Sequence, residues 1–206
     1  ETYSEDTALD LTDIVVSDVD STNVTATLTL STIAAGSLNT GTSGAVTSTY
    51  VAGTGVWTAS GAIADVNILL AGLTFTPAPN FNSNFTIATS VSDSVATPII
   101  GTKNMTGTAA NDTPTDIALT NNNVDENLAI GTLVGTFSTT DVDTGDTFTY
   151  SFCGGTNDAS FSLSGNQLLT AASFNFEGQN SYSICIRSTD PSTAFFDETF
   201  IISVNN

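Results

Sequence analysis

The stretch Val24-Thr25-Ala26-Thr27-Leu28-Thr29-Leu30 indicates the fold class of this 206-residue chain. Apolar side chains alternate with threonine along it, and this period of two predicts a β-strand with one buried face. The same alternation recurs in three runs farther along: Phe148-Tyr150-Phe152, Tyr182-Ile184-Ile186 and Phe200-Ile202-Val204. Gly, Asn and Asp clusters interrupt the runs about every ten residues, a spacing typical of antiparallel β-sandwiches.

The length leaves room for two domains of about a hundred residues, and each could bury its own core. Residues 108–114 are small and polar and end in proline, so we place the boundary there, with domains at 1–110 and 111–206. The one helical candidate, residues 62–70, is expected to bridge two sheets. The sequence therefore predicts an all-β chain of two tandem immunoglobulin-like antiparallel β-sandwiches.

The composition limits the possible partners. The chain has 21 acidic residues against one lysine and one arginine, and its formal net charge is −19. Such a surface repels phosphate backbones and anionic headgroups, which argues against binding to nucleic acid or membranes. No apolar stretch is long enough to span a bilayer. Hydrophobic residues make up 40% of the chain and are regularly patterned, so we expect a folded protein.

Acidic residues occur twice in the same order, on either side of Asn111-Asp112. Each set has a glutamate, then an Asp-x-Asp pair, then a distant aspartate. The sets are Glu5, Asp18, Asp20 and Asp93 in the first domain, and Glu126, Asp141, Asp143 and Asp190 in the second.

Strand parity predicts which acids meet, because in an up-and-down sandwich the chain changes ends with each strand. In the second domain, a strand at residues 128–139 would return the chain to the end where it entered. The acids expected beside the linker are then Asp141, Asp143, Asp146 and Asp190, and those expected at the exit are Glu126 and Glu177. In the first domain, Glu5 is expected to face the linker, and Asp18, Asp20 and Asp93 to lie at the free end.

Clustered carboxylates in a chain with so few basic residues need another source of positive charge. Two unit charges about 5 Å apart repel by roughly 3 kcal/mol at an effective dielectric of about 20. Calcium accepts about six to eight oxygen ligands, magnesium demands tighter octahedral geometry, and zinc prefers histidine or thiolate. The pattern predicts calcium at the junction of the two domains.

The Asp-x-Asp pairs allow two interpretations other than a calcium site at a domain junction. A single Asp-x-Asp pair could be a solvated turn, because aspartate favours turns. The stretch from Asp141 to Asp146 also looks like the start of an EF-hand loop. Phe152 stands where that loop needs its twelfth-position glutamate and the flanks are strands, so we reject the EF-hand.

The second domain resembles a cadherin repeat. Asp125-Glu126-Asn127 stands where that family has Pro-Glu-Asn, and Asp141-Val142-Asp143-Thr144-Gly145-Asp146 is similar to its Asp-x-Asp-x-Gly-Asn loop. Phe176-Glu177 is similar to the end of its Asp-Arg-Glu motif, Asp190 to its Ala-x-Asp, and Asn111-Asp112 to part of its Asp-x-Asn-Asp linker. Asn175 and Thr113 depart from these motifs.

The first domain looks more like the bacterial cadherin-like repeats of large surface adhesins. The segments that carry this resemblance are Glu5-Asp6-Thr7, Val16-Ser17-Asp18-Val19-Asp20-Ser21, Ala64-Asp65-Val66-Asn67, Leu73-Thr74-Phe75-Thr76-Pro77 and Asn80-Phe81-Asn82. Asn80 and Asn82 stand where acids are usual in the family.

The resemblance implies repeats joined end to end, with calcium stiffening each linker. It implies calcium ligands at Glu5, Asn111, Asp112, Asp141, Asp143 and Asp190. The expected function is a calcium-binding structural or adhesion module of an extracellular, cell-surface protein. Its partners would be neighbouring repeats, identical subunits, or a cell-surface protein or glycan.

Two other functions are considered. Acids at both ends of the pair, at Asp18, Asp20 and Asp93 and at Glu126 and Glu177, would suit a subunit that polymerises head to tail into a filament. A carbohydrate-binding module would use aromatics such as Phe81 and Phe85 as a platform, although these are also expected in the core.

Cys153 and Cys185 follow alternating runs at the same phase, Tyr-Ser-Phe-Cys and Tyr-Ser-Ile-Cys. This phase places both on the outward face of neighbouring strands, which predicts a cross-strand disulfide, with buried free thiols as the alternative.

We do not expect an enzyme. The chain has no histidine, so serine or cysteine nucleophiles lack their usual base.

Overall fold

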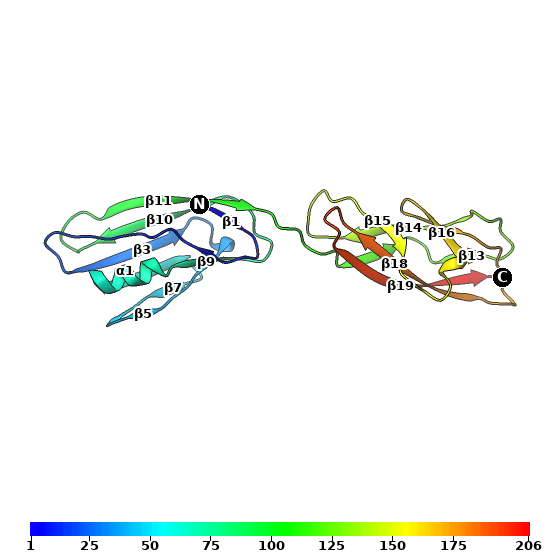
Figure 1. Cartoon of the computed structure of the whole chain (residues 1–206), viewed down its shortest axis with the longest axis horizontal. Helices are drawn as coiled ribbons and strands as arrows, with labels where there is room; N and C mark the ends of the chain where they lie inside the picture. Colours follow the sequence, from blue (N-terminus) through cyan, green and yellow to red (C-terminus); the bar gives the residue numbers. More distant parts are fainter. The chain divides into compact units, whose positions relative to one another are not determined.

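The computed structural model describes the whole chain, from Glu1 to Asn206. The chain forms two compact units, Glu1–Ala110 (unit 1) and Asn111–Asn206 (unit 2). Each unit has its own hydrophobic core, and both are built mainly of strands (Figure 1). The all-β, sandwich-type architecture predicted from the alternating runs is confirmed. None of the helices is long and apolar enough to cross a membrane.

Unit 1 has a six-stranded sheet and a three-stranded sheet. The larger follows the order β1 (Thr2–Ser4), β11 (Ile99–Thr108), β10 (Phe85–Ser92), β3 (Asn23–Leu30), β8 (Val56–Ala62) and β7 (Thr49–Val51). The smaller follows the order β2 (Leu9–Asp10), β9 (Thr74–Pro77) and β4 (Gly36–Leu38). The remaining elements are η1 (Ile33–Ala35), the hairpin of β5 (Thr42–Ser43) and β6 (Val46–Thr47), and helix α1 (Ile63–Ala71).

The stretch of alternating apolar residues and threonines from Val24 to Leu30 forms β3, inside the larger sheet. Val24, Ala26, Leu28 and Leu30 are all buried, and the threonines between them are partly exposed. The helix expected at residues 62–70 is α1, one residue later, and it packs beside β3 and β8 (Figure 1).

Unit 2 has two four-stranded sheets. One follows the order β12 (Asp116–Leu119), β14 (Leu133–Thr140), β17 (Gln167–Thr170) and β16 (Phe161–Ser164). The other follows the order β13 (Asn123–Asp125), β19 (Phe195–Asn205), β18 (Ser181–Thr189) and β15 (Thr149–Phe152), and the short helix η2 (Asp158–Ser160) precedes β16.

The segment before β14 is divided between the sheets, with β12 in one and β13 in the other, and β14 pairs with both β12 and β17. The prediction of a strand at residues 128–139 is wrong at its start, because β14 begins later, at Leu133. Turns precede it, and Gly131 there has a φ of 88°, which interrupts an extended backbone.

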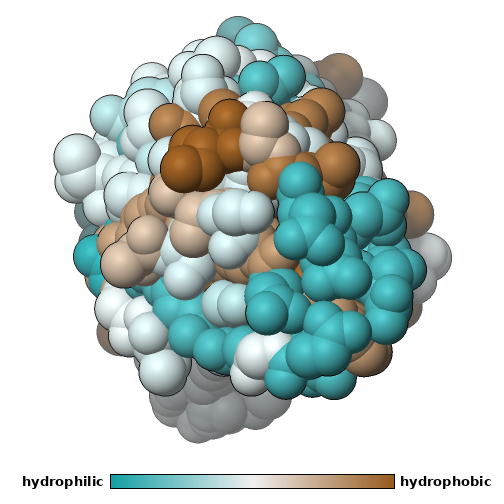
Figure 2. Space-filling model, turned by 90° about the vertical axis from the view of Figure 1, so that its right-hand side faces the viewer, coloured by the Kyte–Doolittle hydropathy of each residue, from teal (hydrophilic) through white to brown (hydrophobic).

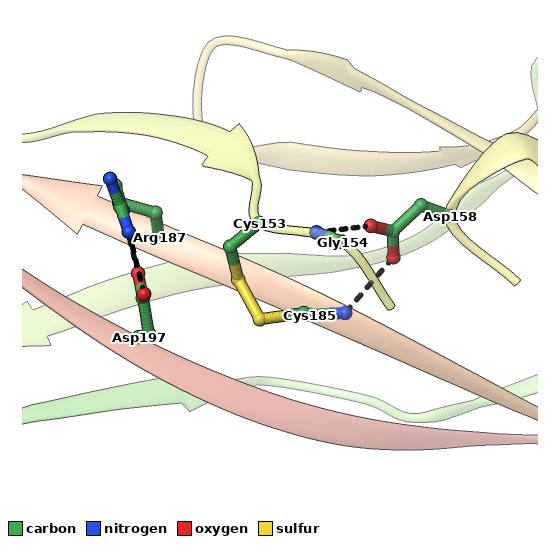
Figure 3. A network of polar contacts seen from close by, with 6 residues as sticks. All are labelled: Cys153, Gly154, Asp158, Cys185, Arg187 and Asp197. Carbon is green, nitrogen blue, oxygen red and sulfur yellow. Dashed lines mark hydrogen bonds and ion pairs between the residues drawn. A yellow bond between two sulfur atoms is a disulfide. The ribbon is translucent and has the colours of Figure 1, made fainter. Parts of the chain in front are cut away.

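The two cysteines form a disulfide, so the free-thiol alternative is wrong. Cys153 directly follows β15, and its backbone N–H donates to the Cys185 carbonyl on β18 at 3.0 Å. Figure 3 shows the Asp158 carboxylate beside the disulfide. This carboxylate accepts the N–H of Gly154 at 3.0 Å and the N–H of Cys185 at 3.0 Å. The disulfide and Asp158 together join β18 to the loop after β15.

We expect the double variant Cys153→Ser, Cys185→Ser to lower the unfolding free energy of unit 2. The link spans a sequence separation of 32, for which chain entropy gives a loss of about 3 to 4 kcal/mol. Chemical denaturation followed by far-ultraviolet circular dichroism measures it. Trp57, the only tryptophan, is buried in unit 1, so its fluorescence supplies an internal control that should not shift. An unchanged unit 2 transition would contradict the expectation.

Candidate metal centres

Three aspartates gather at one end of unit 2. Asp141 directly follows β14 and Asp190 directly follows β18, so two strands from different sheets deliver their carboxylates to the same end. Asp146 returns to them because Gly145 has a φ of 101°, a left-handed conformation that favours glycine. Oxygens of these three carboxylates all lie within 4.8 Å of one another. We call this set the unit 2 acidic group.

The hydrogen bonds of the unit 2 acidic group leave one buried oxygen without a donor. Asp190 is buried, and its carboxylate accepts the N–H of Ala194 at 2.9 Å and the side-chain N–H of Asn111 at 2.8 Å. Asp141 Oδ1 accepts the N–H of Asp143 at 3.0 Å, but Oδ2 is shielded from solvent and accepts no hydrogen bond. An unsatisfied buried carboxylate oxygen is costly, and a bound cation would satisfy it.

The electrostatics of the unit 2 acidic group are repulsive. Desolvation raises the pKa of Asp146 above its ordinary value, and the negative charges of Asp143, Asp141 and Asp190 raise it further. The only arginine, Arg187, is engaged elsewhere, because it forms a bidentate pair with Asp197 at 2.7 Å (Figure 3). Its guanidinium also lies over the Phe195 ring. No basic side chain neutralises the group.

The first residues of unit 2 are tied to the same end. Asn111 Nδ2 donates to Asp190 Oδ2 and to the Asp112 carbonyl, at 2.8 and 2.7 Å. The backbone N–H of Asp112 donates to Asp143 Oδ2 at 2.7 Å. Every acid expected beside the linker from unit 2 is therefore at this end, and Asn111 and Asp112 contact two of them.

A second group of three aspartates lies in unit 1. Asp18, Asp20 and Asp93 bring carboxylate oxygens within 4.8 Å of one another. Asp93 lies in the hairpin between β10 and β11, at the opposite end of β11 from Ala110. This is the end at which strand parity expects these acids. We call them the unit 1 acidic group.

Backbone donors hold two members of the unit 1 acidic group in their charged form. Asp18 Oδ1 accepts the N–H of Ser21 at 2.8 Å and of Asp20 at 3.1 Å, and these bonds lower the pKa of Asp18. The N–H groups of Ala96 and Val95 likewise lower the pKa of Asp93. The pKa of Asp20 is raised by its contact with the Asp18 carboxylate and by the charge there.

Glu5 and Glu126 each follow a short strand that pairs in parallel with the last strand of its unit. Glu5 follows β1, its N–H donates to the Thr108 carbonyl at 3.1 Å, and its Oε1 accepts the N–H of Ala110 at 2.7 Å. Its Oε2 accepts no hydrogen bond. Glu126 follows β13, and its Oε2 accepts the N–H of Phe176 at 3.0 Å.

Glu126 and Glu177 lie at the end of unit 2 that carries the C-terminus. The N–H of Glu126 donates to the Asn205 carbonyl at 2.9 Å, and Asn206 Nδ2 donates to Glu177 Oε1 at 3.4 Å. Figure 2 views this end and shows a hydrophilic area beside an apolar one. The two glutamates belong to no group of three clustered acids.

The aromatics suggested as a sugar platform are core residues. Phe85 is buried, and Phe81 packs edge-on against it with ring centroids 6.1 Å apart.

Two polar residues were missed by the sequence analysis. Asp158 supports the disulfide, as described above. Asn67, on α1, accepts the N–H of Val16 at 2.8 Å and donates to its carbonyl at 2.9 Å. Asn67 was quoted only as part of a family-like segment, and no local pattern pairs it with a residue 51 positions away.

Solved cadherin structures share this fold. Mouse cadherin-23 EC22-24 matches with a TM-score of 0.56 at 16% sequence identity, over 100% of this chain and 62% of that one. Protocadherin gamma B2 extracellular cadherin domains 1-5 match with a TM-score of 0.51 at 16% identity, over 100% of this chain and 38% of that one. The chain thus spans less than two thirds of either structure. No family model matches the chain, and no curated protein matches it in sequence.

The repulsion within the unit 2 acidic group predicts an unusual stability effect. Without divalent metal at neutral pH, Asp146→Asn should raise the melting temperature of unit 2 by a few degrees, because it removes one of several like charges. Asp116→Asn, an exposed change of the same charge on β12, is the matched control and should shift it less.

The pH dependence of this difference follows from the raised pKa of Asp146. A carboxyl whose pKa is higher in the folded than in the unfolded state destabilises the fold above that pKa, and the cost disappears as pH falls through it. The gap between Asp146→Asn and the parent should therefore shrink on acidification. A gap that is absent at neutral pH, or that widens in acid, would contradict the assignment. Differential scanning calorimetry in EGTA measures it.

Proposed function

We propose that this chain, which has the fold of tandem cadherin extracellular domains, is a calcium-binding structural module of an extracellular surface protein. The observation that carries the proposal is the unit 2 acidic group: three carboxylates within 4.8 Å, no basic partner, and a shielded Asp141 oxygen without a donor. Calcium bound there would neutralise the repulsion and satisfy that oxygen.

The donor set suits calcium. Asp141, Asp143, Asp146 and Asp190 offer carboxylate oxygens, and Asn111 offers an amide oxygen. Calcium takes about six to eight oxygens in flexible geometry, so a loop and a strand end can supply them together. The chain has no histidine and its cysteines are joined, which leaves zinc without its preferred ligands.

The proposed mechanical role follows from the linker. Asn111 and Asp112 are hydrogen-bonded to Asp190 and Asp143, so an ion held by those aspartates would also fix the first residues of unit 2. In unit 1, Glu5 Oε1 accepts the N–H of Ala110, the last residue of that unit. Glu5 Oε2 accepts no hydrogen bond and could therefore coordinate a cation. Calcium shared by Glu5 and the unit 2 aspartates would convert a flexible joint into a stiff one.

The extracellular assignment rests on two features. The Cys153–Cys185 disulfide is of the kind that persists in oxidising compartments. Extracellular modules also meet calcium at about 0.1 to 1 mM, the range in which such sites bind. Neighbouring repeats of the same protein are the proposed partners, and we propose no catalytic role.

A second candidate function is a subunit of a head-to-tail filament. The unit 1 acidic group is the observation that favours it, because it repeats the clustered aspartates of unit 2 at the end of β11 opposite Ala110. Glu126 and Glu177, at the C-terminal end of unit 2, could complete such a site on another copy. Light scattering during calcium addition tests this: growth supports the filament, and a constant monomer mass contradicts it.

Calcium should raise the melting temperature of unit 2. At a hundredfold excess over Kd, an ion that binds only the folded form stabilises by about 2.7 kcal/mol. For a domain of this size the shift is roughly 10 to 20 °C. The rise should be largely lost in Asp143→Ala. Thermal unfolding followed by circular dichroism, with and without millimolar calcium, measures it.

The matched control is Asp116→Ala, which removes one exposed carboxylate from unit 2 but none of the proposed calcium ligands. It should keep the full calcium response. An equal response in the two variants, or no response in the parent protein, would rule out the proposed site.

A further inference from the structure

Three hydroxyl groups join the two sheets of unit 2 close to the acidic group. Thr139 is on β14, in one sheet, and Tyr150 and Ser188 are on β15 and β18, in the other. Thr139 Oγ1 lies 2.6 Å from Ser188 Oγ and 2.9 Å from the Tyr150 hydroxyl oxygen, so it is hydrogen-bonded to both. Ser188 is fully buried. We call these three residues the hydroxyl network.

The strands that carry the hydroxyl network are the strands that lead to the acids. Side chains two residues apart on a strand point to the same face of the sheet. Asp141 comes two residues after Thr139, and Asp190 comes two residues after Ser188. The third acid of the group precedes β15, which carries the third hydroxyl. Each acid is therefore connected along the chain to one member of the network.

The inner faces of β14 and β18 change character toward the acidic group. Phe137 on β14 and Ile186 on β18 are buried in the core. Two residues later each strand has a hydroxyl, and two residues after that an aspartate. An apolar side chain of similar size would fill the place of either hydroxyl without needing a hydrogen-bond partner. The packing of the core therefore does not by itself require hydroxyls there.

Hydrogen bonds fix a spacing that apolar contacts do not. The oxygen–oxygen distance of an O–H···O bond is restricted to about 2.5 to 3.0 Å, whereas hydrophobic attraction has no preferred direction. The Tyr150 ring is also stacked on Phe137, with centroids 5.4 Å apart, so the core holds the third hydroxyl in place. The network thus sets the separation of β14 from β15 and β18 beside the acids.

This separation decides whether one ion can contact both sheets. Asp141 and Asp190 follow strands of different sheets, and their like charges push those sheets apart. Oxygens that share one calcium ion lie at most about 5 Å apart, which is twice the calcium–oxygen distance. The oxygens of the unit 2 acidic group lie within 4.8 Å of one another. If the sheets parted here, the ion would lose one of its ligands.

We propose that the hydroxyl network positions the carboxylates of the unit 2 acidic group for calcium. Thr139, Ser188 and Tyr150 are positioning residues, because they touch no ion themselves but hold the two sheets at the separation that calcium needs. This inference rests on the proposed calcium function and names residues outside the ligand set that determine the affinity. The central member is Thr139, since it makes both hydrogen bonds.

Two substitutions of Thr139 separate positioning from packing. Thr139→Val keeps the shape of the side chain but removes the hydroxyl, and Thr139→Ser keeps the hydroxyl but removes the methyl group. The calcium concentration at half-saturation should rise about tenfold in Thr139→Val, as for other residues that orient metal ligands. It should stay at the parent value in Thr139→Ser, although the lost methyl group lowers the melting temperature.

Nuclear magnetic resonance of the Asp143 and Ala194 N–H groups follows the titration. These groups donate to Asp141 and Asp190, so their signals report on the unit 2 acidic group and not on other sites. Ser188→Ala is a milder second variant, because it leaves the bond between Thr139 and the Tyr150 hydroxyl intact. It should shift the half-saturation point in the same direction as Thr139→Val.

A measurement in EGTA tests the positioning without calcium. In Thr139→Val, hydrogen exchange at the N–H groups of Asp143 and Ala194 should become at least about threefold faster, because the carboxylates that accept them are held less firmly. Thr136→Val is the matched control on the same strand, five residues before Asp141, where the lost hydroxyl pairs with Thr120 at 3.2 Å. It should change neither the exchange rates nor the half-saturation point.

The possible outcomes separate this inference from the calcium function. Parent-like half-saturation in Thr139→Val and Ser188→Ala, with unchanged exchange in EGTA, would overturn the inference and leave the calcium function standing. An equal loss of affinity in Thr139→Ser and Thr139→Val would also overturn it, because packing rather than the hydroxyl would then set the affinity. Parent signals that do not respond to calcium would overturn the proposed function and the inference together.

Discussion

Repulsion between carboxylates that the fold brings together is the constraint on which this structure depends. The backbone hydrogen bonds of the two sheets of unit 2 fix the positions of Asp141 and Asp190, and Gly145 turns Asp146 back toward them. A chain with one lysine and one arginine, each paired with an acid, cannot neutralise that charge from within. Desolvation and, after it, the negative charges of Asp143, Asp141 and Asp190 raise the pKa of Asp146. In the proposed function, calcium supplies the positive charge that the chain's own side chains do not.

The β-framework and the acids have separate physical origins. The cores form from alternating apolar residues, such as those of β3. The acids lie in loops at the strand ends, outside the two cores. Residues joining the units, Asn111 and Asp112, are bonded to the acidic loops rather than to either core. In the proposed function, calcium binding therefore changes the flexibility of the linker more than the packing of the sandwiches. The free energy of calcium binding then acts mainly on a few residues at the linker.

Much of this arrangement could be predicted from the sequence, because period-two patterns and strand parity are local rules. They identified β3, β15, β18 and β19, the neighbouring cysteines, and the ends at which Asp18, Asp93, Asp141 and Asp190 lie. The predicted start of β14 was wrong, because the apolar residues near Gly131 are typical of a strand although Gly131 has a positive φ that interrupts it. The bond from Asn67 to Val16 and the support from Asp158 depend on long-range contacts that no spacing encodes.

Small-angle X-ray scattering during a calcium titration from EGTA tests the central claim most directly, because it reports the freedom of the linker itself. The account predicts that the broad distribution of interatomic distances expected of two loosely joined domains narrows to that of one extended particle. The midpoint should coincide with the calcium-induced thermal stabilisation, and Asp143→Ala should shift it to higher calcium. Scattering curves that superimpose in EGTA and in excess calcium would contradict the account.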